Sequence, residues 1–151
     1  MSYRKARECR VYSLDDTTTP CPCSKMIAYE ACCAPYHFGK PPENALILMR
    51  SRYSAYALGL ADYILETTHT SLFSQAHSLE ENRESIKRFA ASTEFAGLWI
   101  HLFEEKAKEA TVVFTAHLLQ SGVDVNFREK SQFLLEEGRR WLYFSGDVQS
   151  V

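Results

Sequence analysis

Four of the chain's five cysteines fall within thirteen residues, where Cys21 and Cys23 flank a proline and Cys32 and Cys33 are adjacent. Two pairs of thiolates on two short segments, with no place for a water ligand, are typical of a structural, tetrahedral Zn²⁺ site. A closed site of this kind has no open position for a substrate. The cluster therefore predicts a zinc-stabilised knuckle rather than a reaction.

Other uses of the cysteines stay open on the sequence alone. An iron–sulfur centre, disulfides and free thiols are the alternatives to zinc. A disulfide between the adjacent Cys32 and Cys33 falls outside ordinary disulfide geometry, whereas a cross-pair such as Cys21 with Cys32 does not. Cys9 lies twelve residues upstream of the cluster. We expect it to be a plain thiol, with a role as a substitute ligand as the alternative.

The N-terminal sequence and the hydropathy favour a cytoplasmic location. The first ten residues are basic, but a polar stretch follows them in place of the apolar core of a secretory signal. No segment is long and apolar enough to cross a membrane. In a reducing compartment a cysteine cluster binds metal more often than it is oxidised. This argument favours zinc over disulfides.

Length and charge limit the function classes. The 151 residues can form one domain with a sizeable core and a small appendage that depends on its metal. Seventeen basic and nineteen acidic residues give a net charge of −2, so no basic surface for nucleic acid is expected. Nine Phe, eight Tyr and two Trp residues favour a sheet with a filled or lined concave face.

The chain divides into an N-terminal arm at 1–20, a cysteine knuckle at 21–36 and a larger domain at 43–148. Three helices are expected in the first half of the larger domain, at residues 43–58, 62–68 and 78–91. Gly59 supplies a C-terminal stop for the first helix, and Asp62 can cap the second. Ser78 and Glu81 form a capping-box signature for the third.

From Phe95 onward the apolar residues alternate with a period of two, which indicates β-strands. Strands are expected at residues 96–105, 110–120, 124–136 and 140–146. Short polar turns between them impose an antiparallel meander. Helices followed by strands predict an α+β fold in which three helices pack on a curved four-stranded antiparallel sheet.

Several segments carry a resemblance to known families. The Cys-Pro-Cys-x8-Cys-Cys run resembles the SEC-C zinc motif. Three further segments resemble the bacterial YchJ family: residues 48–56, residues 61–63 with Thr68-His69, and residues 129–133 with Gly138-x-x-Trp141-x-Tyr143. The resemblance covers about residues 21–147. It implies an N-terminal SEC-C zinc motif followed by a cone of the nuclear transport factor 2 (NTF2) type.

The knuckle departs from the family pattern directly after its second cysteine. Many family members have Gly-Ser-Gly directly after the second cysteine, whereas this chain has Ser24-Lys25-Met26. Glycine there relieves the turn that directs backbone N–H groups at the thiolate sulfur. The resemblance also implies partner binding by the SEC-C motif. We therefore expect a protein partner to contact the exposed side of the knuckle, at Lys25, Met26, Ile27 and Glu30.

An NTF2-like cone implies a pocket, and a small ligand is expected in it. The residues expected to line it are Arg52, Tyr53, His69, Glu129, Ser131 and Trp141, with Tyr56, Trp99, His117, Phe133 and Tyr143 as further candidates. Structural roles compete with several of these assignments. Arg52 and Glu129 are expected to form a buried ion pair, and His69 is expected to support a turn.

Other side chains are expected to have structural or solvent-facing roles. Trp99, Phe133 and Trp141 are most simply core residues. His117 is expected to be an ordinary sheet histidine, and Arg50 is expected to be solvated.

No nucleophile with an adjacent base, phosphate-binding loop or open metal triad is found in the sequence. The sequence therefore predicts no catalytic residue. It favours a non-catalytic adaptor or binding module for a protein or a small ligand, with no nucleic acid or membrane partner and an undetermined oligomeric state. The alternative is a small enzyme that uses His69 or Glu129 in the pocket as an acid or base.

Overall fold

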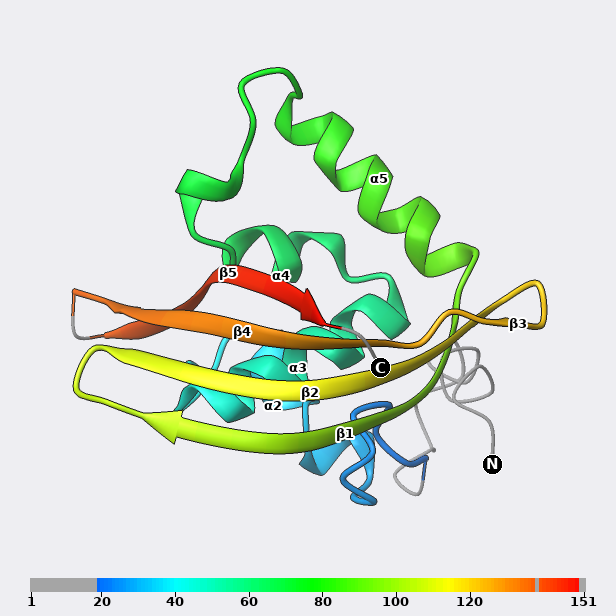
Figure 1. Cartoon of the computed structure of the whole chain (residues 1–151), viewed down its shortest axis with the longest axis horizontal. Helices are drawn as coiled ribbons and strands as arrows, with labels where there is room; N and C mark the ends of the chain where they lie inside the picture. Colours follow the sequence, from blue (N-terminus) through cyan, green and yellow to red (C-terminus); the bar gives the residue numbers. More distant parts are fainter. Residues whose placement is uncertain (1–18, 138, 150–151) are drawn as a thin grey trace.

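The computed structural model describes residues 19–137 and 139–149. Nearly all of the expected N-terminal arm, including Cys9, lies outside the described residues, as does Gly138. Figure 1 shows a curved sheet with α3 and α4 on one side of it and the knuckle beside β1. This arrangement of helices on one face of an antiparallel sheet is the α+β architecture that the sequence predicted.

The helix α3, Ala45–Leu58, forms the centre of the molecule. It begins at Ala45 because the side chain of Asn44 accepts a hydrogen bond from the backbone N–H of Ile47, at 2.8 Å. It ends at Gly59, whose φ of 74° is left-handed, as expected for a C-terminal glycine stop. The predicted helix at 43–58 is therefore confirmed, with its start two residues later.

The two following helices differ in how well their caps were predicted. Helix α5, Leu79–Ala91, has the predicted capping box between Ser78 and Glu81. Helix α4, Ala61–Glu66, is preceded by Leu60 as its N-cap, so the prediction that Asp62 caps it is wrong. Asp62 lies in the first turn, where its carboxylate binds the Arg83 side chain of α5 at 2.8 Å instead. The ion pair ties α4 to α5.

The sheet contains five strands in the described part of the chain, and the long strands are ordered β1-β2-β4-β5 with antiparallel neighbours. Their bounds are β1 Glu94–Glu105, β2 Glu109–Gln120, β3 Val123–Asp124, β4 Phe127–Glu136 and β5 Arg140–Gln149. The expected strand at 124–136 is split between β3 and β4. The split occurs because the Asn126 side chain, and not a backbone carbonyl, accepts from the Leu118 N–H at 2.9 Å.

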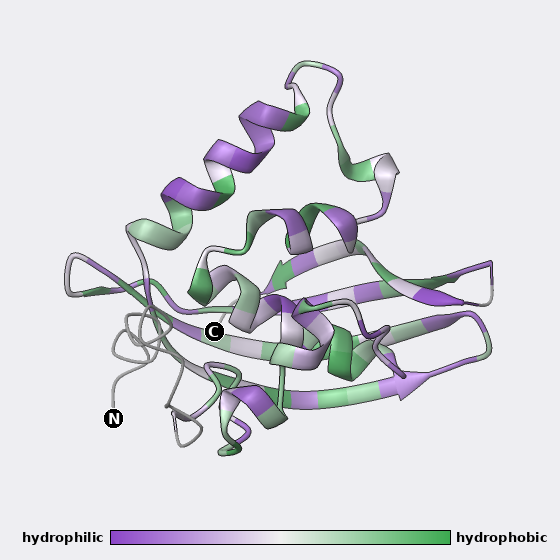
Figure 2. Ribbon diagram, turned by 180° about the vertical axis from the view of Figure 1, so that it is seen from behind, coloured by the Kyte–Doolittle hydropathy of each residue, from purple (hydrophilic) through white to green (hydrophobic). Residues whose placement is uncertain are grey.

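The main core lies between α3 and the concave face of the sheet. Its buried members include Leu48, Met49 and Tyr53 of α3 and Phe95, Val112, Phe133 and Trp141 of the sheet. Figure 2 shows that α5 is mostly hydrophilic along its length. Only Ala90 of α5 is buried, although Phe89 packs against the core. Helix α5 therefore covers one end of the sheet loosely.

Shorter elements complete the fold. They are the 3₁₀ helices η2, Tyr29–Ala31, and η3, Thr70–Leu72, and the four-residue helix α2, Ala34–His37. Both η2 and α2 belong to the cysteine knuckle and its junction with α3. No helix in the described part of the chain is long and apolar enough to span a membrane.

Candidate functional site

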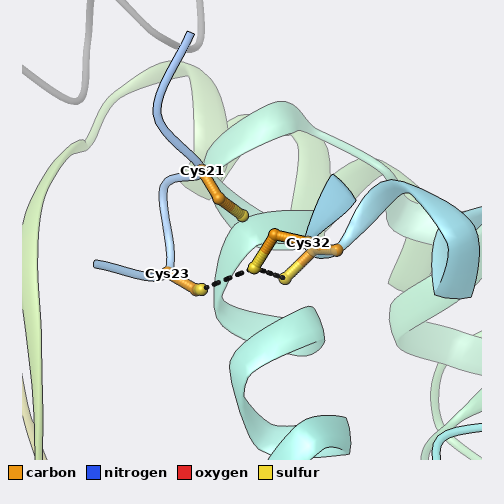
Figure 3. A group of neighbouring side chains, drawn as sticks. Cys21, Cys23 and Cys32 are labelled. Carbon is orange, nitrogen blue, oxygen red and sulfur yellow. Dashed lines mark hydrogen bonds between the residues drawn. The ribbon is translucent and has the colours of Figure 1, made fainter. Parts of the chain in front are cut away.

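The four clustered cysteines converge from two segments of the knuckle. Cys21 and Cys23 lie in the turn of a short antiparallel bridge between Pro20 and Ala28. Cys32 and Cys33 lie between η2 and α2. All four Sγ atoms are within 4.8 Å of one another, and Figure 3 shows Cys21, Cys23 and Cys32 pointing toward a common centre. None of the four forms a disulfide, so the cross-pair left open by the sequence is not formed.

The spacing of the sulfur atoms fits a single tetrahedral ion. Zn–S bonds of about 2.3 Å place the corners of a tetrahedron about 3.8 Å apart. The Sγ atoms of Cys23 and Cys32 are 3.6 Å apart, and those of Cys32 and Cys33 are 3.9 Å apart. The donor set is all sulfur and three of the four residues are buried. The cluster could therefore hold one metal ion in a closed, structural site.

The four thiols of the cluster shift one another's pKa values. Hydrogen bonds with Cys21, Cys32 and Cys33 lower the pKa of Cys23, and the backbone N–H of Lys25 lowers it further. The pKa of Cys33 is raised by its hydrogen bonds to the other three sulfurs and by burial. Four thiolates this close together would repel one another. A divalent cation removes that repulsion and keeps coordinating thiols deprotonated.

The turn after Cys23 shows why glycine is common there in related knuckles. Ser24 and Met26 have φ values of 70° and 63°, in the left-handed region that favours glycine. They stand at the two positions that glycine occupies in the Gly-Ser-Gly pattern. This chain adopts the left-handed backbone with two side chains that disfavour it. Met26 is 83% exposed, so its side chain has no buried contacts to offset that strain.

Hydrogen bonds between described residues attach the knuckle and its junction to the larger domain. Arg50 of α3 donates to the carbonyl oxygen of Cys23 at 2.8 Å, so the prediction of a solvated Arg50 is wrong. Ser24 Oγ accepts from the backbone N–H of Leu98 in β1 at 3.1 Å. His37 Nε2 lies 2.8 Å from the Ser51 carbonyl oxygen of α3. These bonds fix the cysteine loop against both α3 and the sheet.

The tautomer of His37 follows from its neighbours. A carbonyl oxygen only accepts, so Nε2 is protonated and donates a hydrogen bond to the Ser51 carbonyl oxygen. The other ring nitrogen, Nδ1, then accepts from the Tyr29 hydroxyl at 2.7 Å. Burial lowers the pKa of His37, although its bond to Ser51 works against that shift. The neutral ring thus joins η2 of the knuckle to α3.

A second candidate site is a cavity of about 430 Å³ between α3, α5 and the concave face of the sheet. Its walls are mainly aromatic and aliphatic. The polar side chains that line it are Arg52, Tyr53, Tyr56, Ser85, Glu129, Ser131 and Tyr143. A volume of this size, largely apolar and with a few polar groups, is typical of a small-molecule site.

Arg52 and Glu129 both line the cavity, but they do not form the ion pair that the sequence predicted. Arg52 Nη1 donates to the Ile64 carbonyl oxygen and to the hydroxyls of Thr67 and Thr68, at 2.8–3.1 Å. These neutral acceptors at the end of α4 are nearer to the guanidinium than any carboxylate of residues 19–137 and 139–149. Arg52 is only 7% exposed, and burial lowers its pKa.

Tyr143 lies between the two charged residues. The Arg52 Cζ atom is 4.6 Å from the centroid of the Tyr143 ring, and the Tyr143 hydroxyl donates to Glu129 Oε2 at 2.8 Å. Ser131 donates to the same oxygen at 2.6 Å. Burial raises the pKa of Tyr143, and the Glu129 charge raises it further. The tyrosine therefore stays a donor and separates the two charges.

Four of the residues offered for the pocket do not line the cavity, and they are His69, Trp99, His117 and Trp141. The backbone N–H of His69 donates to the Tyr143 carbonyl oxygen at 2.8 Å, and its ring packs on Phe144. His69 Nδ1 accepts from the Ser71 N–H at the start of η3, so the structural role in a turn is confirmed. Trp141 is 4% exposed and belongs to the main core. Its expected core role is confirmed and its placement in the pocket is wrong.

Trp99 is not a core residue, contrary to prediction. It is 51% exposed and stacks on His117 of β2 with ring centroids 5.7 Å apart. The strand register shifts between Phe95 and Gly97. Such a bulge reverses the alternation of side chains after it, so Leu98 points into the core and Trp99 points out. His117 is a sheet histidine as expected, and it pairs with Asp124 at 3.2 Å.

Sequence reasoning missed three residues that position the side chains lining the cavity. Thr67 and Thr68 hold Arg52, as described above. Gly146 of β5 faces Ser131, and a Cβ atom there would overlap the Tyr143 hydroxyl and the Glu129 carboxylate. The only sequence signal for the role of Gly146 is its position inside a strand, where a glycine often marks the close approach of another group.

The fold and the two sites define the class of protein. Residues 44–146 match the family model described as the middle, NTF2-like domain of YchJ. The class is thus an NTF2-like domain preceded by a cysteine knuckle. The chain belongs to the YchJ family, whose relatives below carry the family designation UPF0225.

Sequence and structure relatives agree with this assignment. UPF0225 proteins of Bordetella pertussis and Bordetella parapertussis are each 38% identical over 133 residues, which cover 85% of this chain and 92% of theirs. A SEC-C motif protein from Rhodopseudomonas palustris has a solution structure that superposes with a TM-score of 0.70 at 31% identity, covering 87% of this chain and 99% of that one. A SEC-C motif protein from Psychrobacter arcticus gives 0.71 at 25% identity, covering 89% and 85%.

Proposed function

We propose that this protein is a non-catalytic binding module in which a zinc-fixed knuckle is joined to an NTF2-like domain that binds a small, largely apolar ligand. The observation that carries the proposal is the cavity of about 430 Å³ between α3, α5 and the sheet. Apolar walls supply the free energy of ligand burial, and a few polar groups orient the ligand.

The chemistry of the cavity supports binding over catalysis. No histidine, cysteine or lysine is among the residues that line it. The enzyme alternative used His69 or Glu129 as an acid or base in the pocket, but His69 is not among the residues that line the cavity. One oxygen of Glu129 already accepts from both Tyr143 and Ser131. A general base needs to reach the proton that it removes, and this oxygen is occupied.

Ligand enrichment tests the cavity function. The purified protein is incubated with a metabolite extract, recovered by ultrafiltration and analysed by mass spectrometry. A matched variant is Ser85→Trp, because Ser85 is an exposed residue of α5 that lines the cavity. We expect compounds that are enriched by the wild type and not by the variant. Equal enrichment by both proteins, or none by either, would count against the proposal.

We assign Zn²⁺ to Cys21, Cys23, Cys32 and Cys33 as a structural ion. The support is the closed, all-sulfur donor set, which suits zinc among the metals that bind thiolates. Reduced thiols persist in a reducing compartment, so we also propose a cytoplasmic location. Elemental analysis of freshly reduced protein should return about one equivalent of zinc. Iron in its place, with visible thiolate-to-iron absorption, would overturn the assignment.

A second function, as an adaptor for another protein, is supported by the tip of the knuckle. Met26 is 83% exposed and Ile27 is 38% exposed, and Lys25 and Glu30 beside them are exposed as well. A metal-fixed loop presents such side chains to a partner at low cost in conformational entropy.

The adaptor function is tested at the same residues. A photo-crosslinking amino acid at Lys25 should capture a specific protein in cells. The purified partner should then bind the wild type and lose affinity for a Met26→Ser, Ile27→Ser double variant that retains its zinc. Undiminished binding by that double variant would place the contact elsewhere.

A further inference from the structure

Arg52 has more hydrogen-bonding capacity than the protein uses. Its three hydrogen bonds to described residues all leave from Nη1. A guanidinium has five N–H donors in a planar fork, so Nε and Nη2 retain donors. The side chain is 93% buried and lines the cavity, and no carboxylate of the described residues pairs with it.

Burying a cation without an anion beside it is costly. The neutral acceptors of α4 and the face of the Tyr143 ring stabilise the charge only in part. A carboxylate is planar, carries two acceptor oxygens and matches the guanidinium fork. A ligand with that group would place an anion within hydrogen-bonding distance of the guanidinium, where no carboxylate of the described residues lies.

The other walls of the cavity define the rest of the ligand. Five phenylalanines line it, and they are Phe89, Phe95, Phe114, Phe127 and Phe133. Glu129 lines the cavity too. Burial lowers the pKa of Arg52, and the negative charge of Glu129 acts against that shift. A second negative charge on the ligand would be repelled by Glu129. We therefore propose that the cavity binds a monocarboxylate with an aromatic or aliphatic body, whose carboxylate pairs with Arg52. This inference rests on the proposed small-ligand function.

The test compares matched ligands on the full-length, zinc-loaded protein. Phenylpropionate and its uncharged analogue phenylpropionamide are titrated by calorimetry and by NMR. We expect the carboxylate to bind about tenfold or more tightly than the amide, because hydrogen bonds between charged partners are the stronger ones. Resonances of Tyr143 should shift. Ser85→Trp should abolish binding of both compounds.

Charge variants separate a ligand-binding role from a structural one. Glu129→Gln keeps an acceptor for Tyr143 and Ser131 but removes the negative charge, so it should tighten carboxylate binding and admit phenylsuccinate, a dicarboxylate. Arg52→Lys keeps the positive charge but removes the planar guanidinium fork. It should weaken binding of the carboxylate more than binding of the amide. Folding of each variant is checked by circular dichroism.

The outcomes distinguish this inference from the function on which it rests. If amide and carboxylate bind equally and Ser85→Trp removes both, the cavity binds small molecules but the inference is wrong. Weaker carboxylate binding by Glu129→Gln, or binding that survives Ser85→Trp, also overturns it. If neither compound and no metabolite binds, the small-ligand function itself fails.

Discussion

The guanidinium of Arg52 lies over the ring of Tyr143, with Cζ 4.6 Å from the ring centroid, and this contact connects α3 to β5. The same tyrosine uses its hydroxyl to bind Glu129. Tyr143 thus contacts the buried cation Arg52 through the face of its ring and the anion Glu129 through its hydroxyl. The two interactions can be separated by mutation.

Tyr143→Phe removes the hydroxyl and keeps the ring under Arg52. We expect a loss of about 1–2 kcal/mol in the free energy of unfolding, because a donor to a half-buried carboxylate is lost. Tyr143→Leu also removes the aromatic face and should cost at least about 2 kcal/mol more. Chemical denaturation measures both. Equal losses for the two variants would mean that the ring contact with Arg52 contributes nothing.

Gly146→Ala should destabilise the sheet by about 1–3 kcal/mol, the usual range for an overpacked site. The new methyl group would overlap the Tyr143 hydroxyl and the Glu129 carboxylate. Gly97→Ala is the matched control in the same sheet, since its methyl group meets the outer end of the exposed Trp99 ring at 3.1 Å. That ring can move. A Gly146 variant as stable as the Gly97 variant would contradict the close approach.

Met26→Gly should strengthen metal binding. Glycine adopts the left-handed backbone of this position without the cost of roughly 1 kcal/mol that other residues meet, which corresponds to about a fivefold change in affinity. Met26→Ala is the control because it removes the exposed side chain but keeps the backbone strain. Competition with a chromophoric chelator measures the affinity. The idea fails if the alanine variant gains as much as the glycine variant.

Metal removal should unfold residues 21–36 and spare the larger domain. Structural zinc contributes about 10–16 kcal/mol in small peptides, whereas none of the described cysteines belongs to the core between α3 and the sheet. Hydrogen exchange after chelation should rise in the knuckle and remain slow in β2 and β4. The Cys32→Ser, Cys33→Ser double variant should behave like the chelated protein. Continued protection of residues 21–36 in both would show that the metal is dispensable.

His37 should make stability depend on pH in the acid range. Burial lowers its pKa below the ordinary value, which is about 6.5 in the unfolded chain. Its contribution is fully present above about pH 6.5 and is lost as the pH falls toward its folded-state pKa, because the unfolded chain then binds more protons. His37→Gln should flatten this dependence in denaturation experiments. An identical slope in the variant would show that His37 does not titrate with unfolding.

Local signals in the sequence predicted the elements well. The Ser78 and Glu81 capping box and the Gly59 stop depend on residues within one helical turn, so they can be recognised without the tertiary structure. The clustering of the four cysteines followed from their spacing for the same reason. The split of the strand at Asn126 was missed, because it depends on a side chain that replaces a backbone acceptor in the neighbouring strand.

Contacts between distant elements were harder to predict. Opposite charges on Arg52 and Glu129 suggested a pair, but two threonine hydroxyls at the end of α4 lie closer to the guanidinium. Threonine gives no sequence signal for that role. A bulge near Gly97 turned Trp99 outward, because a one-residue shift of this kind reverses the side chains that follow it, here as far as the second shift between Ile100 and Leu102. Such details are set by packing rather than by local pattern.

The hydrogen bond from Leu98 to Ser24 has a consequence for self-association. β1 is an edge strand of the sheet, and an uncovered edge invites pairing with a strand from another molecule. Ser24 follows the ligand Cys23 directly, so a metal ion in the cluster would hold this cover in place. When metal is scarce, the knuckle would release this backbone amide of β1, and a strand from a second copy could pair with the edge there. A low supply of metal would then favour self-association of the protein.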